Sequence, residues 1–231
     1  MRKLSRRQRE IRTKVDKLMY SDLKEAIKVL LETSTAKFIE TVELHANLNI
    51  DPKYADQQLR TTVTLPNGIG KTIKIAVLTN EANFEEAKTN GADVVGNDEL
   101  IDLISQGNLD FDLLISTPDL MPKLAKLGRV LGPKGLMPSP KSGTVTTTLA
   151  STLSDFKKGK FEYKADKTGV VHVSFGKANF TETQLLENLV ALYSSIQQNR
   201  PSGVKGKYFK KVFICSSMGP SIQLDLEAFP Q

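Results

Sequence analysis

Side chains that commonly carry catalysis or bind metal ions are scarce in this sequence. Its 231 residues include one cysteine, Cys215, and two histidines, His45 and His172. A single cysteine permits neither an internal disulfide nor a zinc site built from cysteines, and it suits a reducing compartment. No carboxylate partner is placed beside either histidine, and the strand-like run that ends at Cys215 predicts a buried thiol. We therefore predict no catalytic site, no metal site and no cofactor.

The two histidines do share one property, which is their place on predicted strands. Apolar and polar residues alternate in residues 38–48, as in a half-buried strand, and His45 falls in the polar set. His172 occupies the same kind of position in residues 170–175. Two interpretations remain open: unrelated surface residues, or one common binding face.

Gly70-Lys71-Thr72 is similar to the end of a phosphate-binding loop. That pattern needs a glycine at position 65, where the chain has Leu65, and a strand follows the motif where a helix is required. No G-x-G-x-x-G follows a strand either. A linker is the expected role, and a nucleotide-dependent enzyme is the disfavoured alternative.

Charge is distributed unevenly along the chain, whose formal net charge is +6. Residues 1–66 and 157–231 together hold 24 basic and 15 acidic residues, a charge of +9, and residues 67–156 hold 8 and 11, a charge of −3. Eight of the basic residues lie within residues 1–17. A charge run is usually a solvated face, but this asymmetry favours a polyanionic partner for the two ends of the chain. Composition alone does not separate RNA from DNA or from anionic lipid.

The elements that must position these residues suggest two domains, the second inserted into the first. Residues 1–66 and 159–231 read as helices and antiparallel strands, with a hairpin turn at Asp166-Lys167-Thr168-Gly169. Residues 67–158 read as short apolar strands alternating with helices, which indicates a small parallel α/β sheet. The fold class is therefore α/β: a split α+β domain with an inserted parallel α/β domain. Within the insert, 132–143 is expected to be a loop, 144–149 a strand and 151–158 a helix.

The chain crosses between the two domains twice, at the glycine-rich segment 66–71 and near residues 157–160. Two crossings with few other contacts would permit hinge motion. The expected hinge residues are Pro66, Gly68, Gly70 and Gly159.

The segment Ser216–Ser221 links the last two predicted strands, and its Gly-Pro pair predicts a turn. Small hydroxyls and a glycine would also let the backbone approach a ligand closely, with Met218 free to pack on a ribose or a base.

Four blocks of sequence, in order, resemble the ribosomal protein L-one family. The first is Thr35–His45 with Asp51-Pro52 and Asp56-Gln57, and the second is Leu65–Lys71. The third runs from Leu127 to Pro138 and ends in Pro140–Val145. The fourth joins Asp166–Gly169 and His172 to Ser217–Ser221.

The resemblance implies a split RNA-binding domain joined by a hinge to an inserted Rossmann-like domain. It implies a structural protein of the large ribosomal subunit that binds rRNA in the mobile stalk at the tRNA exit site and assists release of deacylated tRNA. In bacteria it also implies a translational repressor that binds its own mRNA. Catalysis is not implied.

Carried over by position, the resemblance assigns the RNA face to twelve residues: Lys37, Phe38, Glu40, His45, Lys167, Thr168, Gly169, His172, Ser217, Met218, Gly219 and Ser221. Lysines would contact phosphate, and hydroxyls and backbone N–H groups would reach 2′-OH and phosphate oxygens. Glu40 is expected to bond a ribose hydroxyl or to orient a lysine. Phe38 would stack on RNA or belong to the core, which are equally open.

The remaining expectations concern location and assembly. No stretch approaches the roughly 20 apolar residues of a membrane span, and no apolar segment follows the basic N-terminus as in a secretory signal. We expect a component of the ribosome that is not a homo-oligomer, in a bacterial cytoplasm or a plastid stroma.

Overall fold

The computed structural model describes residues 5–15 and 19–229. Contacts divide the chain into two compact units: unit 1 is Met1–Gly70 with Glu162–Gln231, and unit 2 is Lys71–Phe161. The boundaries expected from the sequence lay three to four residues away from these, at 66/67 and 158/159. With the observed boundaries, unit 2 holds 11 basic and 11 acidic residues, so the whole net charge of +6 belongs to unit 1. Arg2, Lys3 and Lys17 of the predicted basic tail lie outside the described residues.

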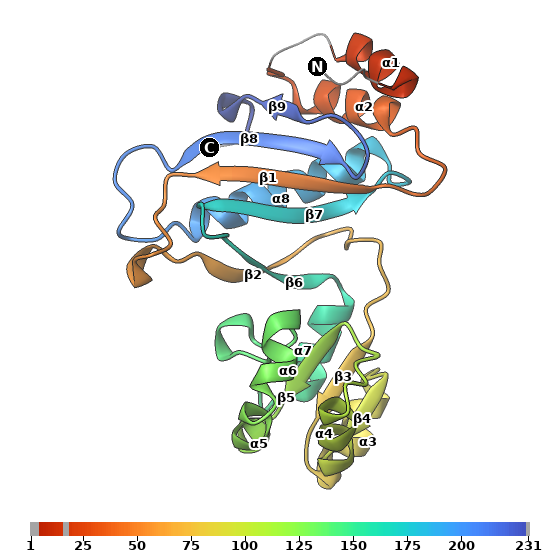
Figure 1. Cartoon of the computed structure of the whole chain (residues 1–231), viewed down its shortest axis with the longest axis vertical. Coiled ribbons are helices and arrows are strands. Elements are labelled where there is room, and N and C mark those ends of the chain that lie inside the picture. Colours follow the sequence, from red (N-terminus) through yellow and green to blue (C-terminus); the bar gives the residue numbers. More distant parts are fainter. Residues whose placement is uncertain (1–4, 16–18, 230–231) are drawn as a thin grey trace. The chain divides into compact units, whose positions relative to one another are not determined.

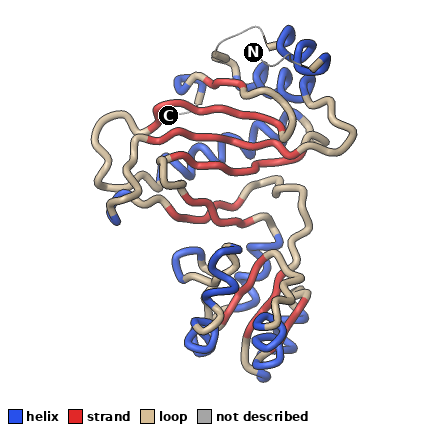
Figure 2. Tube along the Cα trace, in the orientation of Figure 1, coloured by secondary structure: helices blue, strands red, loops and turns tan. Residues whose placement is uncertain are grey.

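Unit 1 combines antiparallel strands with helices from both ends of the chain (Figures 1 and 2). Its helices are α1 (Arg6–Lys14), α2 (Leu23–Thr33) and α8 (Glu182–Gln198). Its strands are β1 (Thr41–Leu48), β2 (Arg60–Thr64), β7 (Val170–Lys177), β8 (Phe209–Ser216) and β9 (Ile222–Leu224). A further strand, β6 (Lys160–Lys164), pairs with β2 and contains the boundary between the units. Short 3-10 turns occupy Ala55–Gln57 and Leu226–Ala228.

The main sheet of unit 1 has the strand order β7-β1-β8-β9, with every pair antiparallel. Along β1, buried and half-buried residues alternate strictly, so one face of the sheet forms the core. α2 and α8 pack against that face, and α8 passes behind the sheet in Figure 1. The other face, called the open face below, carries the polar set of β1. The alternation expected for residues 38–48 is thus present, three residues later at its start.

Local sequence accounts for where the covering helices begin. Thr181 caps α8 in a capping box: its hydroxyl accepts from the Gln184 N–H, and the Gln184 side chain accepts from the Thr181 N–H. Asp22 caps α2 by accepting from the Lys24 N–H. These contacts satisfy N–H groups that have no partner within the helix and so help to define the residue at which each helix begins.

Unit 2 has a parallel sheet of order β4-β3-β5. Its strands are β3 (Ile75–Leu78), β4 (Val94–Gly96) and β5 (Leu113–Ser116). Its helices are α3 (Phe84–Thr89), α4 (Asp98–Ser105), α5 (Met121–Ala125), α6 (Gly128–Lys134) and α7 (Leu149–Lys157). Short 3-10 turns occupy Glu81–Asn83, Pro118–Leu120 and Pro140–Ser142.

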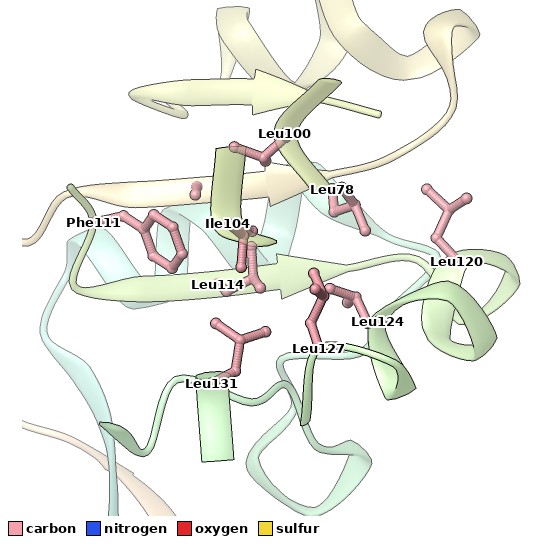
Figure 3. Packing of buried hydrophobic residues seen from close by; sticks show 10 residues of the cluster. Leu78, Leu100, Ile104, Phe111, Leu114, Leu120, Leu124, Leu127 and Leu131 are labelled. Atoms are coloured by element: carbon pink, nitrogen blue, oxygen red, sulfur yellow. The ribbon is translucent and has the colours of Figure 1, made fainter. Parts of the chain in front are cut away.

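Alternate residues of β3 enter two separate cores. Ala76 and Leu78 pack with residues of α4, α5 and α6, the cluster shown in Figure 3. Ile75 and Val77 pack on the other face with residues of α3 and α7. A parallel sheet buried on both faces is the doubly wound arrangement, and the α/β fold class predicted from the sequence is confirmed.

Two local predictions for unit 2 were wrong. The segment expected to be a loop from Gly132 begins as helix, because α6 continues through Pro133 to Lys134 and ends at Gly135 in the left-handed region (φ 71°). The strand expected at 144–149 is reduced to a single bridge between Val145 and Ser116. Lys71 lies in the segment expected to be a linker, and its Nζ is 2.6 Å from Asp112 Oδ1.

Among the described residues, no helix has both the length and the apolar character needed to cross a membrane.

Candidate nucleic-acid interface

The start of β1 and the turn after β8 are joined by paired backbone hydrogen bonds. The Thr41 N–H donates to Ser217 Oγ, and the Ser217 N–H donates to the Thr41 carbonyl, both at 3.0 Å. Val42 lies opposite Ser216 in the register, so the turn follows directly from strand pairing. This places the segment 36–40 beside the turn 216–221, although the two are far apart in sequence.

The Glu40 side chain links the two segments of this junction. Its residue surface is 1% exposed, and its two oxygens accept from the Ala36 and Met218 N–H groups, each at 2.9 Å. Burial acts to raise the pKa of Glu40, but the Met218 and Ala36 N–H donors, the Ser216 side chain and the charge of Arg7 together hold the pKa below its ordinary value. The expectation that Glu40 bonds a ribose hydroxyl or orients a lysine is therefore corrected. Both oxygens of this buried carboxylate accept from backbone N–H groups, and the side chain holds the two segments together.

Three large apolar side chains of the two joined segments are exposed, and one of them is Ile39, at 59%. Phe38 is 58% exposed and Met218 is 55% exposed. The open question about Phe38 is thereby decided, since it is not part of the core. Lys37, Ser217 and Ser221 are also exposed. At Gly219 a Cβ would stand 2.3 Å from Ser216 Oγ, so a larger residue would require the Ser216 side chain to move.

The hairpin residues lie at the opposite end of β1. The Leu48 N–H donates to the Gly169 carbonyl at 3.0 Å, and Gly169 adopts φ 81°. Asp166 organises the turn by accepting from the N–H groups of Thr168 (2.9 Å) and Val170 (2.8 Å), and the Thr168 hydroxyl also donates to it. The Val170 N–H is the main reason that the pKa of Asp166 is lowered. Lys167 is exposed beside this turn.

His45 and His172 lie between the two ends, on the open face. They are directly opposite in the β1–β7 register, and their Nδ1 atoms are 2.7 Å apart. One Nδ1 must donate and the other accept, so at least one ring is neutral. Partial burial, and secondly the charge of His172, lower the pKa of His45, while Glu43 opposes them. The two histidines therefore lie side by side on one face of the sheet.

Two carboxylates and the thiol extend this cluster. Glu43 Oε2 is 3.7 Å from His45 Nε2, and Asp166 Oδ2 is 3.8 Å from His172 Nε2. Cys215 is only half-buried, with its Sγ 3.0 Å from His45 Nε2. The prediction that Cys215 is buried was therefore wrong: in a run where both strand faces are apolar, alternation does not show which set enters the core.

The twelve predicted residues thus form two groups at the ends of one face, with the histidines between them. Six residue steps separate Thr41 from Asn47, so the ends are about 20 Å apart at a strand rise of roughly 3.3 Å per residue.

Sequence reasoning missed two cationic side chains at the start of β1. Arg7 Nη2 donates to the Met218 carbonyl at 2.8 Å, and Lys177 Nζ donates to Thr41 Oγ1 at 2.7 Å. Only the pairing of distant segments reveals them.

The predicted hinge residues differ in how firmly they are held. The Asn188 side chain, fully buried in α8, accepts from the Asn67 N–H and donates to the Gly68 carbonyl, which fixes the segment after Pro66 within unit 1. Gly70 (φ 74°) is the last residue of unit 1 before the crossing, and Gly159 (φ 103°) follows α7.

Comparison with known proteins agrees with this architecture. Residues 30–220 match the model of the ribosomal protein L1p/L10e family. The large ribosomal subunit protein uL1c of Trieres chinensis is 78% identical over 99% of this chain and 100% of its own length. The protein of that name from Phaeodactylum tricornutum is 74% identical over the same shares. The large ribosomal subunit protein uL1 of Prochlorococcus marinus (strain MIT 9515) is 57% identical over 99% of this chain and 97% of its own.

A face of exposed lysines, hydroxyls and apolar side chains on a basic unit is typical of proteins that bind nucleic acid, and such proteins need no catalytic group. The chain belongs to the ribosomal protein L1p/L10e family. It is accordingly a ribosomal protein and not an enzyme.

Proposed function

We propose that this chain is a structural protein of the large ribosomal subunit that binds large-subunit rRNA directly through the open face of unit 1. The observation that carries the proposal is the junction at the start of β1. There Phe38 and Met218 are held out into solvent on backbone that the buried Glu40 carboxylate joins. The large-subunit names of the relatives support the assignment to that subunit.

The chemistry of the face suits folded RNA. Exposed Lys37 and Lys167 at its two ends provide phosphate contacts. The hydroxyls of Ser217 and Thr168 lie where a 2′-OH or a phosphate oxygen can be bonded, and an aromatic ring such as Phe38 can stack on an unpaired base. A span of about 20 Å between the two groups, from the strand rise, favours a folded junction over a single nucleotide.

With unit 1 anchored on the rRNA, the chain is part of a mobile stalk at the tRNA exit site and assists release of deacylated tRNA. Support comes from the division into two compact units and from glycines with positive φ, Gly70 and Gly159, at the crossings. The site of action is the ribosome of a plastid or of a bacterial cytoplasm.

The same face would serve a second role, repression of translation by binding the chain's own mRNA. This follows if the messenger presents a structure like that of the rRNA junction, because the face reads shape and backbone.

A filter-binding comparison tests these proposals. The full chain is titrated against an rRNA stalk fragment, a fragment of its own messenger, and a hairpin of unrelated sequence, at low and at moderate salt. We expect the stalk fragment to bind at least tenfold more tightly than the unrelated hairpin at both salt concentrations. Equal affinity for the two would reject specific rRNA binding, and a messenger affinity no better than the hairpin's would reject repression.

A further inference from the structure

The centre of the open face brings three potential metal ligands together by strand register. Glu43 and His45 are two residues apart on β1, so their side chains lie on the same face, and Cys215 of β8 is directly opposite Glu43. Among residues 5–15 and 19–229, this is the one group of three or more such side chains whose donor atoms all lie within 4.8 Å of one another. We propose that Glu43, His45 and Cys215 bind a thiophilic divalent cation, with Zn²⁺ as the physiological ion.

Two of the three donor separations lie within about 0.6 Å of the values for a tetrahedral ion. With Zn–S near 2.3 Å and Zn–N near 2.05 Å, tetrahedral angles require a sulfur–nitrogen separation of about 3.6 Å. A carboxylate oxygen and an imidazole nitrogen require about 3.4 Å. The structure has 3.0 Å from Cys215 Sγ to His45 Nε2, and 3.7 Å from Glu43 Oε2 to the same nitrogen. These two separations differ from the tetrahedral values by about 0.6 and 0.3 Å. The third, from Cys215 Sγ to the Glu43 carboxylate oxygen, is within 4.8 Å and would close to about 3.6 Å around the ion.

The donor types select the ion. A thiolate and an imidazole favour Zn²⁺ or its substitute Co²⁺ over Mg²⁺ and Ca²⁺, which take oxygen ligands. Three protein donors leave a fourth position for water or another ligand. Binding converts the Cys215 S–H bond into an S–metal bond, and the thiol proton passes to the buffer.

The neighbours of His45 are placed as a metal-bound imidazole requires. An imidazole that ligates through Nε2 usually donates its Nδ1–H to an oriented acceptor. His45 Nδ1 lies 2.7 Å from His172 Nδ1, and the far nitrogen of His172 faces Asp166 at 3.8 Å. His172 would thus accept from His45 and, with Asp166, orient the ring.

Solvent access to the ligands and the rigidity of their backbone also support metal binding at this site. The side chains of His45 and Glu43 are 24% and 40% exposed, so an ion can enter from solvent. Their backbone belongs to β1, which is paired on both sides, by β7 and by β8. The site is therefore held largely in place before the ion arrives.

The test is a Co²⁺ titration of the full chain, free of any tag, reduced and stripped of metal, with no RNA present. We expect a thiolate-to-cobalt charge-transfer band that saturates at one Co²⁺ per chain and disappears when Zn²⁺ is added. Because Cys215 is the only cysteine in the sequence, the band in the unmodified protein already reports this residue. Absence of the band, or saturation at half an equivalent through two chains sharing one ion, would overturn the proposal.

Variants then assign the other ligands. We expect Cys215→Ser to abolish the band, and Glu43→Gln and His45→Gln each to weaken Zn²⁺ binding at least tenfold in competition with a chromophoric chelator. Glu187→Gln is the matched control, since that exposed carboxylate lies outside the cluster, and it should leave the affinity unchanged. Circular dichroism confirms that each variant is folded. Zinc binding that survives in folded Cys215→Ser would refute the site. The outcome is independent of the filter-binding result, because no RNA takes part.

Discussion

The Glu40 carboxylate accepts a hydrogen bond from the backbone N–H of Met218, at 2.9 Å across 178 positions of sequence. Its other oxygen accepts from the Ala36 N–H. A side chain predicted to touch RNA instead joins the two segments that carry the exposed Phe38 and Met218. The positions of the exposed Phe38 and Met218 side chains therefore depend on a residue that is itself buried.

Replacing this carboxylate should destabilise unit 1. In Glu40→Gln the amide keeps one acceptor oxygen but turns an NH₂ toward the other backbone N–H, which is left without a partner. A buried unsatisfied donor costs about 1–3 kcal/mol, so the free energy of unfolding in urea should fall by about that amount. Glu187→Gln, at an exposed position, is the control and should change little. A Glu40→Gln protein as stable as the unmodified chain would show that the two hydrogen bonds are unimportant.

Met218→Asp should weaken binding to the rRNA stalk fragment at least tenfold and leave the fold intact, because the side chain is 55% exposed. A carboxylate there would replace apolar contact with repulsion of phosphate. Met19→Asp adds the same charge at another exposed methionine (48%) and separates local contact from net charge. Equal losses in both variants would mean that Met218 acts only through long-range electrostatics.

Sequence patterns were sufficient for most of the framework. Alternation in residues 38–48 identified β1 and put His45 on a polar face, and short apolar runs identified the parallel strands of unit 2. These predictions succeed because a strand buried on one face needs apolar residues at alternate positions, and a strand buried on both faces needs a short continuous apolar run.

What sequence could not supply depends on which distant segments meet. The partners of Glu40 lie four and 178 positions away, and only the pairing of β1 with β8 shows that its oxygens are occupied. Cys215 was assigned to the wrong face because Phe213 and Cys215 are as apolar as Val212 and Ile214. The thiol–imidazole cluster was missed for the same reason.

The hairpin glycine should tolerate no side chain. Gly169 adopts φ 81°, and a Cβ would stand 2.9 Å from the Ile50 carbonyl oxygen. Gly206 has a similar φ of 76° with nothing within 4 Å of the added Cβ. The left-handed conformation costs a non-glycine residue about 1–2 kcal/mol, so Gly206→Ala should lose about that much stability. Gly169→Ala should lose clearly more in the same urea titration, and equal losses would show that the contact with Ile50 relaxes freely.

Removal of unit 2 should leave rRNA binding largely in place. Replacing Lys71–Phe161 by a short Gly-Ser linker between Gly70 and Glu162 removes no net charge and none of the twelve predicted RNA-face residues. We expect the affinity for the stalk fragment to stay within about threefold of the full chain's, a change of about 0.7 kcal/mol by affinity arithmetic. Loss of binding by a shortened chain with a native-like circular dichroism spectrum would place essential contacts in unit 2.

The cluster around His45 should make the fold sensitive to mild acid. Burial and His172 lower the pKa of His45 in the folded chain, so the unfolded chain binds more protons between the folded pKa and the unfolded value of about 6.5. Stability from this residue is therefore complete above that value and is lost as the pH falls below it. Glu43 on β1, Cys215 on β8 and His172 on β7 face the ring, and Asp166 faces His172. Thermal unfolding at pH 7.5 and 5.5, with a chelator present, should show a larger decrease in Tm for the unmodified chain than for His45→Gln. Equal decreases in the two proteins would show that another group controls the response.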